Sequence, residues 1–494
     1  MAAMNSMHFL VRVAATLLLA AGVGSGQAAE TRPGLKPCRL QGLEHDAWCG
    51  VVQRPLDPGQ PQGLQIDVHY AVLPALARNR KPDPVLFFAG GPGQSAIELG
   101  GTVSRLLARL AYRRDVVLVD QRGTGRSAPL QCAEQPAAAP LADSIDPGRQ
   151  LARAQACLAQ LKTLPHGDLR HYTTSVAVQD ADAVRVALGV GQVNLVGGSY
   201  GTRAALEYMR QFPGAVRRAV LDGVAPPDMV LPLAMSSDNQ AALDGVLAAC
   251  KAESTCSQRW PALAADWRAL LASLPRQAKV VHPLTGAVEQ LTLTRDAVLA
   301  LVRGPLYAPV LSSALPLAIH EGARGRFDAL VGLSASLGGR ATGRLSEGMH
   351  FSVVCAEDLP RWALSGDAPG ADFGQSLADN YQKVCAFWPR GVVPAAFYQV
   401  GTASAATLVL SGGADPVTPP RHGQRVTQAL GAKARHVVVA QAGHGVMALA
   451  CMRDVLFRFV DAQTDDMALK VDADCAQAMP RPGAFQPPGR AFTP

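Results

Sequence analysis

One ten-residue stretch carries the strongest structural signal in the chain: Asn194-Leu195-Val196-Gly197-Gly198-Ser199-Tyr200-Gly201-Thr202-Arg203. Its first part is apolar enough for a buried strand, and residues 203–209 suit a helix. Between them lies Gly-x-Ser-x-Gly, the pattern of a sharp turn that lifts a serine hydroxyl above the end of a sheet. Such a turn leaves almost no room for neighbouring side chains, which explains the glycines. We therefore predict a nucleophile at Ser199.

Apolar runs on both sides of this stretch predict the rest of a sheet. Strands are expected at 84–89, 115–120, 219–224, 406–411 and 436–440, and an alternating pattern within 48–73 predicts antiparallel strands before them. Helical spacing at 176–188 and 423–430 separates some of these runs. Alternating strands and helices predict an α/β fold with a mostly parallel central sheet flanked by helices.

Two further residues complete a catalytic pattern. Asp415 follows the strand at 406–411, and His444 stands on a glycine-flanked loop after the strand at 436–440. The chain order serine, aspartate, histidine is that of an α/β-hydrolase triad. In that arrangement His444 takes the proton of Ser199, and Asp415 orients the histidine and stabilises its charged form.

A second glycine cluster, Gly90-Gly91-Pro92-Gly93, ends the first parallel strand and predicts an oxyanion hole. We assign one donor to the amide of Gly91 and the other to the amide of Tyr200. A phosphate-binding loop is the rival interpretation, but the Lys-Ser/Thr pair that it needs is missing. We expect Asp120 and Arg122 to hold the loops around the oxyanion segment.

Composition excludes several classes of protein. The chain has 494 residues, 48% of them hydrophobic, and a net charge of +7 from scattered basic residues rather than a basic run. Nothing in this pattern predicts nucleic-acid binding.

Residues 1–29 have the basic start, short apolar run and small residues of a signal peptide. We therefore expect an exported protein, periplasmic or secreted, with no membrane anchor after signal removal. We also expect a monomer.

Ten cysteines in an exported chain favour disulfides. They fall into near-neighbour pairs, and although sequence does not fix connectivity, we predict Cys38/Cys49, Cys132/Cys157, Cys250/Cys256, Cys355/Cys385 and Cys451/Cys475. Metal ligation is the alternative, but no Cys-x-x-Cys or His-rich spacing supports it. We predict neither a metal nor a cofactor.

The alternation of predicted strands and helices stops near residue 226 and resumes after residue 400. We predict a hydrolase core at 30–225 and 401–494, with a mostly helical cap inserted at 226–400. In the helix at 176–188, Asp180 and Asp182 are expected on a solvated face.

Together these motifs resemble the exported tripeptidyl aminopeptidase-like group, relatives of proline iminopeptidase within the α/β-hydrolase fold. The matches are Gly90–Gly93, 120–127, 197–202, 412–419 and 442–445. The resemblance implies a serine exopeptidase that acts on peptides with a free N-terminus. It also implies cap acids that bind the substrate amine; Glu357 and Asp358 are the matching candidates, and of the two we favour Glu357. Ala89 replaces the histidine that usually precedes the glycine loop in proline iminopeptidases, so strict prolyl specificity is not implied.

Two other functions use the same sequence features. A carboxylesterase would share the triad but lack an amine-binding acid. A hydrolase-fold binding protein without catalytic activity would keep the fold alone. Blocking the substrate N-terminus distinguishes the first from an aminopeptidase, and reaction of Ser199 with a fluorophosphonate tests the second.

Overall fold

A computed structural model describes residues 32, 34–336 and 344–487. Its centre is a mixed sheet with nine strands among these residues, in the order β1-β2-β3-β5-β4-β6-β7-β10-β11. The predicted signal peptide lies outside the described residues. The strands are β1 (Lys36–Cys38), β2 (Ala47–Pro55), β3 (Gln65–Leu73), β4 (Val85–Phe88), β5 (Val116–Val119), β6 (Val193–Gly198), β7 (Val216–Asp222), β10 (Ala406–Gly412) and β11 (Ala434–Val439).

The sheet is antiparallel at its beginning and parallel elsewhere, as the sequence predicts. β1, β2, β3 and β5 pair antiparallel, whereas β5, β4, β6, β7, β10 and β11 pair parallel. β6 lies between β4 and β7, with Leu195 opposite Leu86 and Ala219. The parallel strands therefore end at one edge, where the sites of such sheets form.

Helices cover both faces of the sheet because its central strands are apolar on both sides. In β4, Leu86 and Phe88 pack into one apolar cluster, whereas Val85 and Phe87 pack into the other. This alternation is the normal consequence of strand geometry. The helices that complete the core are α1 (Gly100–Leu106), α2 (Ala108–Ala111), α5 (Thr174–Ala187), α6 (Tyr200–Gln211), α16 (Pro420–Leu430), α17 (Ala450–Asp461) and α18 (Asp465–Leu469).

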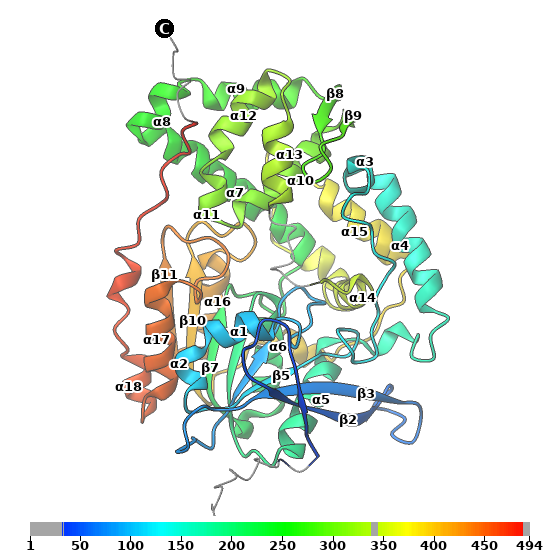
Figure 1. Cartoon of the computed structure of the whole chain (residues 1–494), viewed down its shortest axis with the longest axis vertical. Helices are drawn as coiled ribbons and strands as arrows, with labels where there is room; N and C mark the ends of the chain where they lie inside the picture. The colour runs from blue at the N-terminus through cyan, green and yellow to red at the C-terminus, as the bar shows by residue number, and fades with distance from the viewer. Residues whose placement is uncertain (1–31, 33, 337–343, 488–494) are drawn as a thin grey trace, which may run out of the picture.

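A cap lies over the carboxyl edge of the sheet, with its own apolar core (Figure 1). Its helices are α7 (Leu231–Ala252), α8 (Ser254–Arg259), α9 (Leu263–Ala272), α10 (Arg295–Leu306), α11 (Pro309–Ser312), α12 (Leu315–Ala323), α13 (Asp328–Ala335), α14 (Glu347–Glu357) and α15 (Ser376–Phe387). A hairpin of β8 (Arg276–Val281) and β9 (Val288–Leu293), which the sequence interpretation missed, interrupts them.

Two helices from the first core segment also join the cap. α3 (Leu141–Ile145) and α4 (Pro147–Leu161) leave the sheet after β5. Leu141 and Ile145 pack against the cap's apolar cluster, and the N–H of Leu141 donates to Glu289 of β9 over 2.8 Å. The cap is therefore built from more than one stretch of sequence.

All five predicted cysteine pairs are confirmed as disulfides. Two of them lie near the junction between core and cap: Cys132 joins Cys157 of α4, and Cys355 of α14 joins Cys385 of α15. No helix among the described residues combines the length and the apolar character that crossing a membrane requires.

Candidate active site

Ser199 lies at the tip of the turn between β6 and α6. Its φ of 55° is in the left-handed region, which is strained for a residue with a β-carbon. Gly197 and Gly201 permit the turn, because a β-carbon on either would collide with backbone atoms, those of Phe88 in the case of Gly201. Ser199 is half-buried and Tyr200 is buried. The turn thus has the geometry that the sequence predicts for a nucleophile.

Asp415 and His444 contact each other at the ends of β10 and β11. Oδ2 of Asp415 lies 2.8 Å from Nδ1 of His444. Because the carboxylate accepts, Nδ1 carries the proton and Nε2 is left to take one up. Burial disfavours both charges, but their mutual attraction outweighs it. The pKa of Asp415 is therefore lowered, and the pKa of His444 is raised above the ordinary 6.5.

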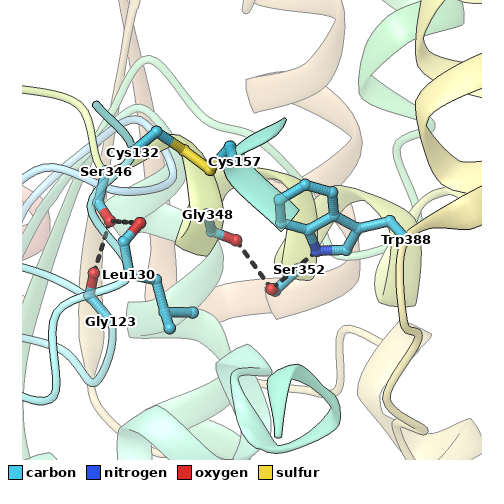
Figure 2. Close-up of a disulfide and its surroundings, with 8 residues drawn as sticks. All are labelled: Gly123, Leu130, Cys132, Cys157, Ser346, Gly348, Ser352 and Trp388. Atoms are coloured by element: carbon cyan, nitrogen blue, oxygen red, sulfur yellow. Dashed lines mark hydrogen bonds between the residues drawn. A yellow bond between two sulfur atoms is a disulfide. The ribbon is translucent and has the colours of Figure 1, made fainter. Parts of the chain in front are cut away.

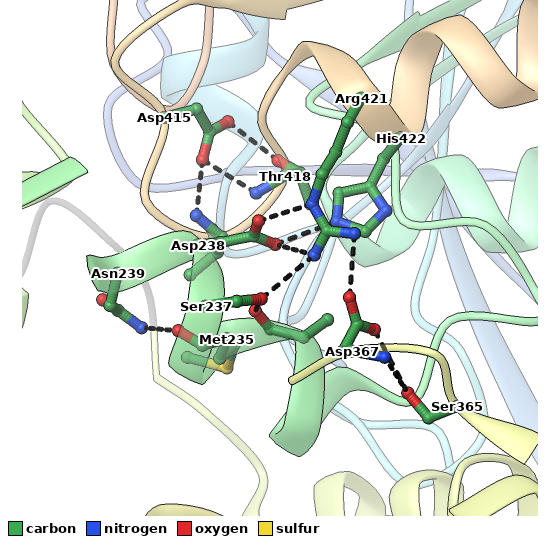
Figure 3. Close-up of polar contacts among 12 residues, drawn as sticks. Met235, Ser237, Asp238, Asn239, Ser365, Asp367, Asp415, Thr418, Arg421 and His422 are labelled. Carbon is green, nitrogen blue, oxygen red and sulfur yellow. Dashed lines mark hydrogen bonds and ion pairs between the residues drawn. The ribbon is translucent and has the colours of Figure 1, made fainter. Parts of the chain in front are cut away.

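Thr418 fixes the carboxylate of Asp415 from the same turn (Figure 3). Its hydroxyl donates to Oδ2 over 2.8 Å and lies 3.1 Å from Nδ1 of His444. The N–H groups of Val417 and Thr418 each donate to Oδ1 over 2.9 Å. Both carboxylate oxygens are therefore held in place. Sequence reasoning missed Thr418, although a hydroxyl three residues after an acid is a known turn signal.

Tyr307, just after α10, is a cap residue that contacts His444. Its carbonyl accepts the His444 N–H over 2.9 Å. The two rings meet edge to face with centroids 5.3 Å apart. No sequence signal marks a single tyrosine in the cap for this position.

Asp222, at the end of β7, connects the serine turn with the histidine loop. Its carbonyl accepts the Ser199 N–H over 2.8 Å. Its carboxylate accepts the N–H groups of Val446 and Met447 over 3.0 and 2.9 Å. Burial raises the pKa of Asp222 to about 6, against the effect of these amides. Sequence reasoning treated Asp222 as an ordinary strand residue.

Gly223 follows Asp222 and leaves space for the histidine ring. It has a φ of 64°, and a β-carbon there would lie 3.1 Å from Cε1 of His444. A side chain at this position would therefore press on the ring of the predicted base.

The predicted oxyanion loop lies beside the serine turn. A β-carbon on Gly90 would lie 3.4 Å from Cβ of Ser199, and Gly91 has a φ of 111°. Among the hydrogen bonds of the described residues, neither the N–H of Gly91 nor that of Tyr200 has an acceptor. Tyr200 is the first residue of α6, where N–H groups have no partner within the helix. Within the part of the chain that the structure describes, both predicted donors are therefore free next to Ser199.

Residues before and within α14 hold the oxyanion loop in place. The N–H of Ser346 donates to the carbonyl of Gly93 over 2.8 Å, and its hydroxyl proton is shared between the carbonyls of Gly123 (2.6 Å) and Leu130 (2.9 Å). Figure 2 shows Ser346 beside the disulfide between Cys132 and Cys157. The cap thus supports the loop through backbone contacts.

His350 is a second link between α14 and the oxyanion loop. Its Nδ1 lies 3.1 Å from the carbonyl of Pro92 and its Nε2 lies 2.8 Å from the hydroxyl of Tyr381. Because a carbonyl only accepts, Nδ1–H donates to Pro92, and Nε2 accepts from the tyrosine in the neutral ring. Burial lowers the pKa of His350 to about 4, so the ring is neutral near pH 7.

Asp238 of α7 fastens the cap to the helix that follows the predicted acid (Figure 3). Its carboxylate accepts from Nε and Nη2 of Arg421 over 2.7 and 3.0 Å. His422 Nε2 lies 2.9 Å from the same carboxylate. Arg421 also pairs with Asp367 over 2.8 Å. The first turn of α16, directly after the Asp415 loop, is therefore held by cap residues.

The two predicted amine-binding acids lie at the end of α14 and are 0% and 1% exposed. Arg203 of α6 pairs with both, at 3.4 Å from Glu357 and 3.0 Å from Asp358. Thr174 donates to Glu357 through its N–H and its hydroxyl, and this hydroxyl lies 2.7 Å from the hydroxyl of Tyr200. Burial raises the pKa of Glu357 to about 7, against the effect of Arg203. The cluster therefore reaches the residue that follows the nucleophile.

Asp120 has the role that the sequence predicts, but Arg122 does not. Oδ1 of Asp120 accepts the hydroxyl of Ser95 over 2.6 Å and the N–H of Ile97 over 3.1 Å, just after the oxyanion loop. Arg122 instead pairs with Asp180 over 2.7 Å, away from this loop.

The prediction that Asp180 lies on a solvated face of α5 is wrong. This residue is fully buried, because it neutralises the buried guanidinium of Arg122 and also accepts from Nε of Arg54 over 3.1 Å. Asp182 is partly exposed, and it accepts from the hydroxyl of Tyr208 over 2.7 Å and from Arg185. Helical spacing places a residue on a face, but only tertiary packing shows whether that face is covered.

Within the described ranges, no group of three or more His, Cys, Asp or Glu side chains is placed to hold a metal ion.

Comparison with known families identifies the family of this fold. Residues 83–449 match the family model described as alpha/beta hydrolase fold. The chain belongs to this family. The match begins just before β4 and ends after the His444 loop, so it includes every predicted site residue and the cap. The predicted fold class is confirmed.

Three relatives show where the similarity lies within the family. The tripeptidyl aminopeptidase of Streptomyces lividans is 32% identical over 224 residues, which cover 42% of this chain and 41% of the relative. Serine protease Hip1 of Mycobacterium tuberculosis (strain ATCC 25618 / H37Rv) is 26% identical over 458 residues, covering 84% and 87%. The proline iminopeptidase of Neisseria meningitidis serogroup A is 30% identical over 142 residues, covering 28% and 32%.

These names confirm the resemblance to tripeptidyl aminopeptidases and proline iminopeptidases. The matched part of this chain spans about two fifths of the length of the Streptomyces enzyme. The alignment with the mycobacterial protease covers most of both chains.

Proposed function

We propose that this protein is an exported serine peptidase that releases short N-terminal pieces from peptides, as a tripeptidyl peptidase or an aminopeptidase. The observation that carries the proposal is the grouping of Ser199, on its strained turn, with the Asp415–His444 pair and the free amides of Gly91 and Tyr200. The relatives named as aminopeptidases and serine proteases support the choice of peptide substrates.

In the proposed reaction, Ser199 Oγ attacks the carbonyl carbon of the scissile peptide bond. Nε2 of His444 takes the hydroxyl proton, and Asp415 stabilises the imidazolium. The developing oxyanion is bound by the amides of Gly91 and Tyr200. His444 then gives the proton to the leaving amine, an acyl-enzyme remains, and a water molecule activated by His444 hydrolyses it.

For the free N-terminus we propose the acids at the end of α14. Glu357 and Asp358 together face one guanidinium, that of Arg203, so the ionised cluster lacks one positive charge. Oδ2 of Asp358 has no hydrogen-bond partner among the described residues, whereas Glu357 accepts from Thr174, so we propose Asp358 rather than Glu357 as the acceptor for a substrate ammonium. This oxygen is covered, so neighbouring side chains must shift when the amine binds.

Export is part of the proposal. The signal-like residues 1–29 support it, and so do the five disulfides, which persist in oxidising compartments such as the periplasm or the extracellular medium.

The experiment that tests this function is hydrolysis of aminoacyl and tripeptidyl chromogenic amides, each with a free and an acetylated N-terminus, beside a short-chain ester. We expect cleavage of the free-amine amides only. Asp358→Asn should raise KM for these substrates, whereas Asp244→Asn, an exposed acid of α7, should not. Ester cleavage with inert amides would instead establish a carboxylesterase.

A further inference from the structure

A polar cleft enters the cap between α4, α7, α10 and α15. Its volume is about 280 Å³, and its lining includes Asn239, Arg303 and Asn380. Arg303 lies one helical turn before Tyr307, whose ring packs on His444. One wall of the cleft is therefore formed by the helix that leads into Tyr307.

Arg303 is a cation without a counterion. Its side chain is half-buried, and among the described residues it has neither a hydrogen bond nor an ion pair. Asp296 and Asp379 line the same cleft, but neither is within ion-pairing distance of it. A partly desolvated guanidinium is unfavourable unless an anion or other acceptors satisfy it, so this residue is ready to receive one from a ligand.

Asn239 supplies an unsatisfied acceptor in the same cleft. The residue is 1% exposed, and its Nδ2 donates to the carbonyl of Met235, as Figure 3 shows. Its Oδ1 is buried without a partner. Buried polar atoms nearly always have a partner in folded proteins. Lys383, an exposed residue of α15, also lines the cleft. The cleft thus offers the cations Arg303 and Lys383 for a carboxylate and one acceptor for an N–H group, the two chemical groups that a peptide carries together.

We propose that this cleft is a substrate subsite in which Arg303 binds a carboxylate of the peptide and Asn239 accepts a peptide N–H. The inference rests on the proposed peptidase function and adds a preference for anionic peptides. The carboxylate can come from the C-terminus of a short peptide or from an acidic side chain, and the experiment below distinguishes the two.

The position of Tyr381 agrees with a peptide that spans the cap. This residue follows Asn380 on α15, and its hydroxyl contacts His350. Burial raises the pKa of Tyr381 to about 12; the charge of Arg303 opposes this and that of Asp358 adds to it. In the proposed complex, the substrate ammonium at Asp358 and a carboxylate at Arg303 belong to one short peptide.

The test uses two matched pairs of peptides with free N-termini. One pair differs only in a C-terminal carboxylate against a C-terminal amide. The other pair, both amidated, differs only in aspartate against asparagine. Release of products by the full-length enzyme is followed by mass spectrometry, which gives kcat and KM for wild type, Arg303→Met, Arg303→Lys and the control Arg268→Met. Arg268 is an exposed arginine of α9, outside the cleft.

We expect wild type to have a KM about 10- to 100-fold lower for the carboxylate member of at least one pair. Arg303→Met should remove this difference with kcat nearly unchanged, because binding and not chemistry is affected. Arg303→Lys should keep part of the preference, and Arg268→Met should keep all of it. The pair that responds identifies the source of the carboxylate.

Equal KM values within both pairs for wild type, or a preference that survives in Arg303→Met, would overturn the subsite. A chromogenic tripeptidyl amide without a carboxylate serves as the reference substrate, and wild type and Arg303→Met should cleave it equally. If wild type cleaves neither this amide nor any peptide, the proposed function itself is wrong, and the subsite with it.

Discussion

The carbonyl oxygen of Asp222 lies 2.8 Å from the amide nitrogen of Ser199 and accepts its hydrogen bond. The carboxylate of the same Asp222 accepts the N–H groups of Val446 and Met447, on the loop that carries His444. One residue at the end of β7 therefore fixes both the proposed nucleophile and the proposed base. Because proton transfer depends strongly on their separation, Asp222 is a positioning residue of the site.

Replacing Asp222 by alanine should weaken both the fold and the reaction. The amides of Val446 and Met447 would lose their acceptor in a buried place, at about 1–3 kcal/mol each. We expect the free energy of unfolding, measured in urea, to fall by roughly 2–5 kcal/mol, and kcat to fall with it. Asp222→Asn keeps one acceptor oxygen and should lose less. Unchanged stability and kcat in the alanine variant would contradict this role.

The pH dependence of kcat/KM should reflect the interaction between Asp415 and His444. The proposed base works only when neutral, so activity falls as the pH drops through its pKa. That pKa is raised above 6.5, mainly because Asp415 outweighs burial, and the acidic limb should therefore lie above pH 6.5.

Asp415→Asn removes the negative charge that favours the protonated histidine. The acidic limb should move to lower pH, and kcat should fall by about 10⁴-fold, as when such an acid is replaced in serine proteases. Initial rates between pH 4 and 9 on a free-amine amide measure both effects. A limb that moves upward in this variant would refute the assignment of Asp415.

Thr418 offers a milder perturbation of the same pair. Thr418→Val keeps the shape of the side chain but removes the hydroxyl that donates to Asp415. The loss of one hydrogen bond, about 1–1.5 kcal/mol, should lower kcat by about 5- to 10-fold. Thr418→Ser keeps the hydroxyl and should remain near wild type. Equal kcat values for the valine and serine variants would show that the hydroxyl does not contribute.

The contact between cap and core at Asp238 can be tested independently of the chemistry. Asp238→Ala leaves Arg421 and the buried His422 without their shared acceptor. The free energy of unfolding should fall by roughly 1–3 kcal/mol, because the first turn of α16 loses its anchor. Asp244→Asn on the same helix is the matched control, since its side chain is exposed. If both variants unfold like wild type, the cap is held by other contacts.

The positions of Ser199, Asp415 and His444 could be predicted because each depends on a local pattern. An apolar run ends at a turn, and the chemistry-bearing residue stands just after it. The alternation of strands and helices was sufficient to predict a mostly parallel central sheet. Pairing each cysteine with a near neighbour in sequence predicted the five disulfides, although sequence spacing does not fix connectivity.

Residues whose role depends on distant contacts could not be predicted. Tyr307 reaches His444 only because the cap folds over the sheet, and Asp180 is buried only because Arg122 lies against α5. Asp222 looks like the polar end of any strand until the histidine loop is placed beside it.

The cap contains elements whose local sequence pattern is weaker. Buried and exposed residues alternate in β8, and Ala278 and Val280 are the buried ones. The strand is short, however, and only some of its exposed residues are charged or polar. Such segments are poorly distinguished from loops between helices. Likewise, nothing local shows that α3 packs on the cap rather than on the sheet.

The most direct measurement of the central claim is hydrolysis of a tripeptidyl chromogenic amide with a free N-terminus by wild type and by Ser199→Ala, with circular dichroism to show that the variant is folded. We predict that wild type cleaves the amide and reacts with a fluorophosphonate at Ser199. The folded variant should do neither. Near wild-type turnover by folded Ser199→Ala would contradict the proposed mechanism.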